Sequence, residues 1–135
     1  MQIVPTAFPT LLLADDNLSL LETLVEMLQA TYKVLGAFSD GNSVLSDIFA
    51  LNPDILLLDI SLGDLNGFEV ARRLRERGSS AKIIFLSVHE DVEFVTASFD
   101  AGACGYVFKA RAAALKARLG PRFSICDLPN VVRQP

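Results

Sequence analysis

Five polar or charged residues stand where short apolar runs of the chain end. Asp15 and Asp16 follow one run, Asp59 ends a second, Ser87 ends a third and Lys109 follows a fourth. A short apolar run bounded by turn residues is typical of a strand that is buried on both faces. Ligands of open α/β sheets bind outside the carboxyl ends of the strands. We therefore expect these five side chains to gather at one edge of a sheet.

Three carboxylates brought together repel one another, and each ionised group raises the pKa values of its neighbours. Such a cluster needs a cation. Lys109 supplies one positive charge, and Mg²⁺ supplies two at a site of a few carboxylates, waters and a phosphate. The set suits phosphoryl transfer, with a carboxylate as the nucleophile that becomes an aspartyl phosphate. Each residue alone has a simpler explanation: a helix cap for Asp15 and Asp16, a turn for Asp59, a surface position for Lys109.

The elements that must position these residues alternate between strand and helix. The predicted strands cover residues 10–14, 32–36, 54–59, 82–87 and 104–108, and the predicted helices cover about 18–28, 42–51, 67–77, 91–99 and 110–119. Asn17 or Asp16 is the expected cap of the first helix. Alternation of this kind predicts an α/β fold with a doubly wound, five-stranded parallel sheet, helices on both faces and right-handed crossovers. The apolar residues expected on buried helix faces include Leu18, Leu21, Leu24, Val25 and Leu28 in the first helix and Val92, Val95 and Phe99 in the fourth.

Length and composition favour one globular domain. The chain has 135 residues, of which 51% are hydrophobic, and this content argues against disorder. No run approaches the roughly 20 apolar residues of a membrane span, and the first residues lack the pattern of a signal peptide. Two cysteines, Cys104 and Cys126, and a single histidine, His89, indicate neither a disulfide scaffold nor a structural zinc site. A reduced, cytoplasmic compartment is the expectation.

Charge is distributed unevenly along the chain. Residues 1–100 carry 15 acidic and 6 basic side chains, whereas residues 101–135 carry 1 acidic and 6 basic ones. An acidic body is a poor ligand for nucleic acid, so we expect no direct nucleic-acid binding by this chain and no membrane association.

Residues 10–111 resemble the receiver domain of two-component response regulators. The pieces that carry the resemblance are Leu13-Ala14-Asp15-Asp16, Leu58-Asp59-Ile60-Ser61 with Gly67 eight residues after Asp59, Leu86-Ser87, and the run from Ala101 to Lys109. The phrase from Ser87 to Asp91 and the Gly-Tyr-Val-Phe-Lys run are most similar to the receivers of LuxR-type helix-turn-helix regulators. The resemblance implies a flavodoxin-like sheet with strand order 2-1-3-4-5.

The resemblance also implies a phosphorylation site. Asp59 would accept a phosphoryl group from a histidine kinase or a small phosphodonor. Asp15, Asp16 and Asp59, with the backbone carbonyl of Ser61, would hold Mg²⁺. The chain would not be an enzyme in the usual sense, beyond its own phosphorylation and a slow autodephosphorylation.

A conformational switch is the third implication. Ser87 and Lys109 would each bind a phosphoryl oxygen, and Tyr106 would turn inward as Ser87 moves toward the phosphate. The face formed by the fourth helix, fifth strand and fifth helix would then change its affinity for a partner, including a second copy of the chain.

Three positions near the site depart from the usual receiver pattern, and a lone histidine lies beside them. Gly63 stands where many receivers have proline, and this predicts a more mobile loop. Val88 replaces a small residue and is expected to crowd the phosphoryl site. Ala110 stands where many receivers have proline, which is a mild departure. His89 is either a modulator of dephosphorylation or a loop residue without a chemical role.

The two ends of the chain are expected to differ from the central domain. Residues 1–9 are predicted to be an irregular leader, 10–119 the receiver domain and 120–135 an irregular or atypical tail without an output domain. The chain is thus a stand-alone receiver, a truncated transcriptional regulator or one whose end was altered. A short fifth helix would expose part of the fourth-helix face, and this predicts a homodimer or a domain-swapped oligomer.

Two alternative functions remain open at this stage. One is a phosphatase of the haloacid dehalogenase-like type, which also combines an aspartate nucleophile, a hydroxyl, a lysine and Mg²⁺. In that class, however, the acidic pair comes last in the chain rather than first. The other is a binding-only receiver, although this chain retains all five key positions.

Overall fold

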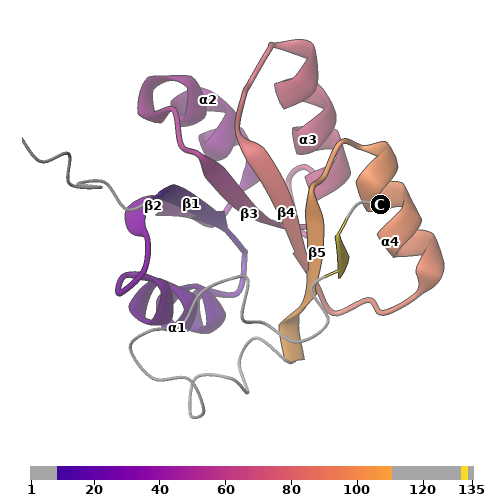
Figure 1. Cartoon of the computed structure of the whole chain (residues 1–135), viewed down its shortest axis with the longest axis horizontal. Helices are drawn as coiled ribbons and strands as arrows, with labels where there is room; N and C mark the ends of the chain where they lie inside the picture. Colours follow the sequence, from indigo (N-terminus) through magenta and orange to yellow (C-terminus); the bar gives the residue numbers. More distant parts are fainter. Residues whose placement is uncertain (1–8, 111–131, 134–135) are drawn as a thin grey trace, which may run out of the picture.

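Five parallel strands and four helices alternate in the computed structural model, which describes residues 9–110 and 132–133 (Figure 1). In chain order they are β1 (Thr10–Ala14), α1 (Leu18–Leu28), β2 (Lys33–Phe38), α2 (Gly41–Leu51), β3 (Ile55–Asp59), α3 (Gly67–Glu76), β4 (Lys82–Ser87), α4 (Val92–Asp100) and β5 (Gly105–Phe108). The strand order β2-β1-β3-β4-β5 is the one predicted. The α/β class and the flavodoxin-like topology are confirmed.

A sixth, antiparallel strand adds to the five predicted parallel strands. β6 (Val132–Arg133) pairs antiparallel with β5 and makes the far edge of the sheet. It falls in the tail that was expected to be irregular, because two residues are too few to show an alternating pattern. β2 also differs from its predicted span, since it runs to Phe38 rather than ending at Gly36. The predicted fifth helix, beyond Ala110, lies outside the described residues.

Apolar side chains on opposite faces of the sheet form two separate cores. Successive residues of a strand point to opposite faces. Leu56 and Leu58 of β3 therefore pack with residues of α2 and α3, whereas Leu57 packs with residues of α1. Figure 1 shows α1 on one side of the sheet and α2 and α3 on the other. The central strands are buried on both faces, as the continuous apolar runs predicted.

Helix starts follow the polar residues of the preceding loops. The side chain of Asn17 accepts a hydrogen bond from the backbone N–H of Leu20, which confirms it as the cap of α1. Asp40 caps α2 and Asn66 caps α3 in the same way. These caps fix where each helix leaves the carboxyl end of the sheet.

The predicted buried faces of α1 and α4 are wrong at one residue each. The side chain of Leu18 is 62% exposed and that of Val92 is 78% exposed. Each is the first residue of its helix, and helical spacing alone does not show how far the sheet extends beneath the first turn. Leu21, Leu24 and Leu28 are buried as expected, while Val25, Val95 and Phe99 are partly buried against the two cores.

Candidate functional site

Acidic residues from two neighbouring strands meet at the carboxyl edge of the sheet. β1 is the neighbour of β3, so Asp15 and Asp16 after β1 lie beside Asp59 at the end of β3. One carboxylate oxygen from each of the three lies within 4.8 Å of the others. Asp15 and Asp59 are buried and Asp16 is exposed, so the cluster opens to solvent on the side of Asp16. The sequence predicted this gathering.

Lys109 lies against the two buried carboxylates. Its Nζ is 3.0 Å from Oδ2 of Asp15 and 3.1 Å from Oδ1 of Asp59, and its side chain is 14% exposed. Burial lowers the pKa of Lys109, but the hydrogen bond to Asp15 and the charges of Asp59 and Asp15 outweigh it, and the net change is upward. Lys109 is therefore the fixed cation that the cluster requires.

One lysine does not neutralise the cluster. The pKa of Asp59 is raised to about 6, first by burial and then by the charge of Asp15, against the opposing effects of Lys109 and the Ser61 amide. An ionised Asp59 at neutral pH is thus held at a free-energy cost. A further cation at this position would remove that cost.

An unpaired oxygen marks where such a cation or a phosphoryl group fits. Oδ1 of Asp59 accepts a hydrogen bond from the N–H of Ser61, and Oδ1 of Asp15 accepts one from the N–H of Asn17. Oδ2 of Asp59 is buried and has no hydrogen-bond donor among the described residues. Oδ2 of Asp15 also lacks an ideal hydrogen bond but is ion-paired with Lys109. The cluster thus offers several hard oxygen atoms, and one lysine does not balance their negative charge. Such a set of ligands matches the preference of Mg²⁺.

The loop between β3 and α3 carries Ser61 beside Asp59. Ser61 and Asn66 form an isolated antiparallel bridge that closes the loop, and the N–H of Gly67 donates to the carbonyl of Ile60 at 2.6 Å. A Cβ atom on Gly67 would lie 2.4 Å from the backbone oxygen of Asp59. Only glycine permits this close approach, so Gly67 determines how tightly the loop folds back over the end of β3.

Ser87 and the two residues that follow it form the rim of the site at the end of β4. The Ser87 side chain is buried, and its Oγ accepts a hydrogen bond from the N–H of His89 at 3.0 Å. The imidazole ring of His89 stacks on Phe94, with ring centroids 3.9 Å apart. The Val88 side chain is 69% exposed and lies on the surface at this rim. The expected crowding by Val88 stays a prediction, as does a chemical role for His89.

Tyr106 lies inside the fold. Its side chain is fully buried, and its hydroxyl donates a hydrogen bond of 2.6 Å to the backbone carbonyl of His89. Burial and the charge of Asp91 raise the pKa of Tyr106, while its hydrogen bond with Ser87 opposes this. The phenol thus connects β5 to the rim loop that follows Ser87.

Asp64 is a structural residue that the sequence analysis missed. From the β3–α3 loop, its carboxylate accepts hydrogen bonds from the backbone N–H groups of Gly41 and Asn42 at the start of α2. Those partners are 23 and 22 residues away in sequence. A local sequence pattern cannot show so distant a contact; the only available signal was an acid in a turn-rich loop.

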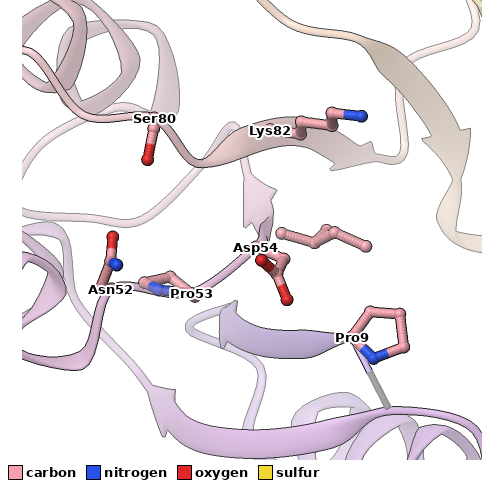
Figure 2. A pocket seen from close by; sticks show the side chains of 7 residues that line it. Pro9, Asn52, Pro53, Asp54, Ser80 and Lys82 are labelled. Atoms are coloured by element: carbon pink, nitrogen blue, oxygen red, sulfur yellow. The ribbon is translucent and has the colours of Figure 1, made fainter. Parts of the chain in front are cut away.

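A surface hollow of about 540 Å³ lies at the opposite, amino-terminal edge of the sheet (Figure 2). Its lining includes Asn52, Asp54, Ser80 and Lys82. Asp54 is already used, since it accepts hydrogen bonds from the N–H and hydroxyl of Thr10 and so joins β3 to β1. The hollow is therefore remote from the acidic cluster, and nothing in its chemistry makes it a competing site.

No helix within residues 9–110 is long and apolar enough to cross a membrane.

Comparison with known proteins gives matches over most of the chain. The family model described as the response regulator receiver domain matches residues 11–119. The transcriptional regulatory protein DegU of Brevibacillus brevis is 31% identical over 101 residues, covering 73% of this chain and 43% of DegU. The nitrate/nitrite response regulator protein NarL of Escherichia coli K12 is 35% identical over 103 residues, covering 74% of this chain and 47% of NarL. The solved signal receiver domain of NarL from Mycobacterium tuberculosis superposes with a TM-score of 0.74 at 27% identity, over 82% of this chain and 93% of that one.

Proposed function

This chain belongs to the response regulator receiver domain family, and on that basis we propose that Asp59 is its phosphorylated residue. Members of the family are regulatory phosphoacceptors that interact with histidine kinases. The observation that carries the proposal is the state of Asp59: buried, with an unpaired Oδ2 and a pKa near 6, next to a fixed lysine. An oxygen that lacks a donor in the resting protein is available to form a bond.

The proposed step transfers one phosphoryl group. Oδ2 of Asp59 attacks phosphorus, an O–P bond forms, and the bond from phosphorus to the donor's imidazole nitrogen breaks. The electron pair of the broken bond stays on the imidazole, which takes up a proton from solvent. Asp59 must be ionised to attack, and a pKa of about 6 keeps it largely ionised at neutral pH while leaving it more basic than an ordinary aspartate.

Mg²⁺ would be held by the carboxylates of Asp15, Asp16 and Asp59 and by the backbone carbonyl of Ser61. When bound, it would neutralise the charge that collects between the carboxylates and the phosphoryl oxygens. The support for this ligand set is the 4.8 Å grouping of the three carboxylates, together with the loop geometry that fixes Ser61 beside Asp59. Exposed Asp16 offers the side from which the ion enters.

Lys109 and Ser87 would bind the transferred group. Lys109 already touches Oδ1 of Asp59, so it can follow the new charge with little movement. The hydroxyl of Ser87 accepts a hydrogen bond from the N–H of His89 and can redirect its own proton from Tyr106 to a phosphoryl oxygen. Movement of Ser87 would pull on the loop that also holds the Tyr106 hydroxyl, and this links Tyr106 to the phosphorylation state.

The proposed output is a change in the face that contains α4 and β5. Near it, Phe68, Phe94 and Ala97 line a small apolar hollow, and Val92 is exposed. Apolar surface of this kind supports a homodimer or domain-swapped pair that depends on phosphorylation. The fifth helix, which would complete the face, lies outside the described residues.

The chain spans less than half the length of the curated relatives DegU and NarL. Control of transcription is therefore proposed only for a longer protein in which this domain would regulate a DNA-binding output. A cytoplasmic location and the lack of direct nucleic-acid binding also stay proposals.

The two alternative functions differ in how well they fit this chain. The match to the receiver family favours a phosphoacceptor domain over a haloacid dehalogenase-like phosphatase. A binding-only receiver is the remaining competitor, and phosphorylation separates the two. Incubation with acetyl phosphate and Mg²⁺ should add one phosphoryl group to the protein, detected by intact mass spectrometry. The added mass should be lost with hydroxylamine, which cleaves acyl phosphates.

Three variants complete this experiment. Asp59→Asn should remove the added mass, whereas Asp47→Asn, at an exposed position of α2, should retain it. Asp16→Ala should fold normally, and its phosphorylation should no longer depend on Mg²⁺. A protein that folds, binds a partner and never gains the mass would be a binding-only module.

A further inference from the structure

The N-terminus of α2 is held by two aspartates from different parts of the chain. Asp40 immediately precedes the helix and accepts hydrogen bonds from the N–H of Ser43 at 2.7 Å and from its hydroxyl at 2.9 Å. Asp64 comes from the β3–α3 loop and accepts from the N–H groups of Gly41 at 2.9 Å and Asn42 at 3.0 Å. The side-chain amide of Asn42 donates a third bond to Asp64, at 2.9 Å.

The helix does not need the second aspartate in order to begin. An aspartate directly before a helix is by itself a preferred cap, and Asp40 fills that role. Asp64 uses the amides that Asp40 leaves free, and its negative charge lies at the positive end of the helix dipole. These donors lower the pKa of Asp64 to about 2, so the contact persists throughout the neutral and mildly acidic range. The contact instead gives the loop an attachment point on a rigid element.

The loop is otherwise anchored by apolar side chains, since Leu62 is buried in the core and Leu65 packs against it. Gly63 has a φ of +88° and open space around its Cα, a backbone conformation that proline cannot adopt. The stiffening that many receivers obtain from proline is thus unavailable to this chain at Gly63. The bridge between Ser61 and Asn66 closes the base of the loop, and the Asp64 carboxylate makes the hydrogen bonds that join the tip of the loop to α2.

Packing supports the same connection. A Cβ atom added to Gly41 would lie 2.8 Å from Cγ2 of Val70, 3.1 Å from Cβ of Leu65 and 3.5 Å from Oδ1 of Asp64. The first residue of α2 therefore presses directly on the loop and on α3. Loop, α2 and α3 form one close-packed unit next to Asp59.

We propose that Asp64 is a positioning residue of the phosphorylation site: by binding the N-terminus of α2 it holds the β3–α3 loop, and with it Ser61, in the position required for cation binding beside Asp59. This inference rests on the proposed function, because it assigns the loop's rigidity to the Mg²⁺ site. A loop held in this way would be less mobile than Gly63 alone predicts.

The experiment compares Asp64→Ala with Asp40→Ala. Both variants remove a carboxylate that caps α2, but only Asp64→Ala frees the loop. Mg²⁺ affinity is measured by NMR titration of backbone amides, and exchange of the Ser61 amide hydrogen is measured in metal-free protein. Residues that orient metal ligands typically contribute about 10- to 100-fold to affinity. We expect Asp64→Ala to weaken Mg²⁺ binding about tenfold and to speed exchange at Ser61.

Asp40→Ala should lower the unfolding midpoint while leaving Mg²⁺ affinity within about twofold of the parent protein, since it changes helix stability alone. Asp64→Asn keeps one acceptor oxygen and should recover much of the affinity. Equal Mg²⁺ affinity in Asp64→Ala and the parent protein would overturn the proposal, and so would an equal loss in Asp40→Ala. If the parent protein itself binds no Mg²⁺, the proposed function fails, whereas unchanged exchange at Ser61 in metal-free Asp64→Ala refutes the tether.

Discussion

Replacing Asp59 by asparagine should stabilise the metal-free protein at neutral pH. Asp59 is 2% exposed, and its pKa is raised to about 6 from an ordinary value of 3.8, with burial as the first cause and Asp15 as the second. Between these two pH values the unfolded chain has released the proton that the folded protein still holds. The stability of the parent protein must therefore fall as pH rises from about 4 to about 6 and stay low above that range.

The size of the effect follows from the two pKa values. Each tenfold change in a protonation equilibrium is about 1.4 kcal/mol, so the interval from 3.8 to about 6 corresponds to about 3 kcal/mol at pH 7. At pH 4 less than about 1 kcal/mol remains, because Asp59 is protonated in the folded state. Asparagine is neutral at every pH, and Lys109 keeps its ion pair with Asp15 in the variant.

Urea unfolding in the presence of EDTA, followed by circular dichroism from pH 4 to pH 7.5, measures this difference. The chain contains no tryptophan, so a helix signal is the suitable probe. Asp47→Asn serves as the control, since this exposed position lies on α2. Addition of Mg²⁺ should stabilise the parent protein by about 1.4 kcal/mol for each tenfold excess over the dissociation constant and should stabilise Asp59→Asn less.

Parallel pH profiles for the parent protein and Asp59→Asn would contradict a raised pKa of Asp59. They would mean that Lys109 already neutralises the cluster fully, and that no free-energy cost remains for a cation to relieve. A destabilised variant at pH 7 would contradict it more strongly.

Three further substitutions test the surroundings of Asp59. Lys109→Ala leaves two buried carboxylates unpaired and should cost about 3 kcal/mol in urea unfolding at pH 7. The loss should shrink at pH 5, where Asp59 is protonated. An equal loss at both pH values would contradict the role of Lys109 as the counterion of these carboxylates. Gly67→Ala places a Cβ against the Asp59 backbone and should cost roughly 3 kcal/mol, so unchanged urea stability would show that the loop has room to move. Tyr106→Phe loses the hydrogen bond to His89 and should cost about 1 kcal/mol while phosphorylation by acetyl phosphate persists; loss of phosphorylation would place Tyr106 in the chemistry itself.

Most of the fold follows from local sequence signals. Continuous apolar runs identified the buried strands, and Asn17 identified the start of α1. The gathering of Asp15, Asp16 and Asp59 was predictable because parallel strands bring their carboxyl ends to one edge. Helical periodicity predicted burial wrongly at Leu18 and Val92. It shows which residues share one face of a helix, but not whether the sheet extends beneath the whole of that face.

Contacts between segments far apart in sequence were beyond prediction. Asp64 reaches amides more than twenty residues upstream, and the short strand β6 adds to the sheet edge through only two residues. The electrostatic state of Asp59 also depends on burial and on two partners from other strands, so it required the three-dimensional structure. In each case the missing information is which surfaces meet, and the sequence of one segment does not contain it.

The most direct test of the account is the location of phosphate after incubation with acetyl phosphate and Mg²⁺. The modified residue can be identified by borohydride reduction of the acyl phosphate, which converts the aspartate to homoserine, followed by peptide mass spectrometry. We expect modification at Asp59 in the parent protein and in Asp47→Asn, and none in Asp59→Asn. Phosphate on a different aspartate, or an unmodified protein that still binds Mg²⁺ at the cluster, would contradict it.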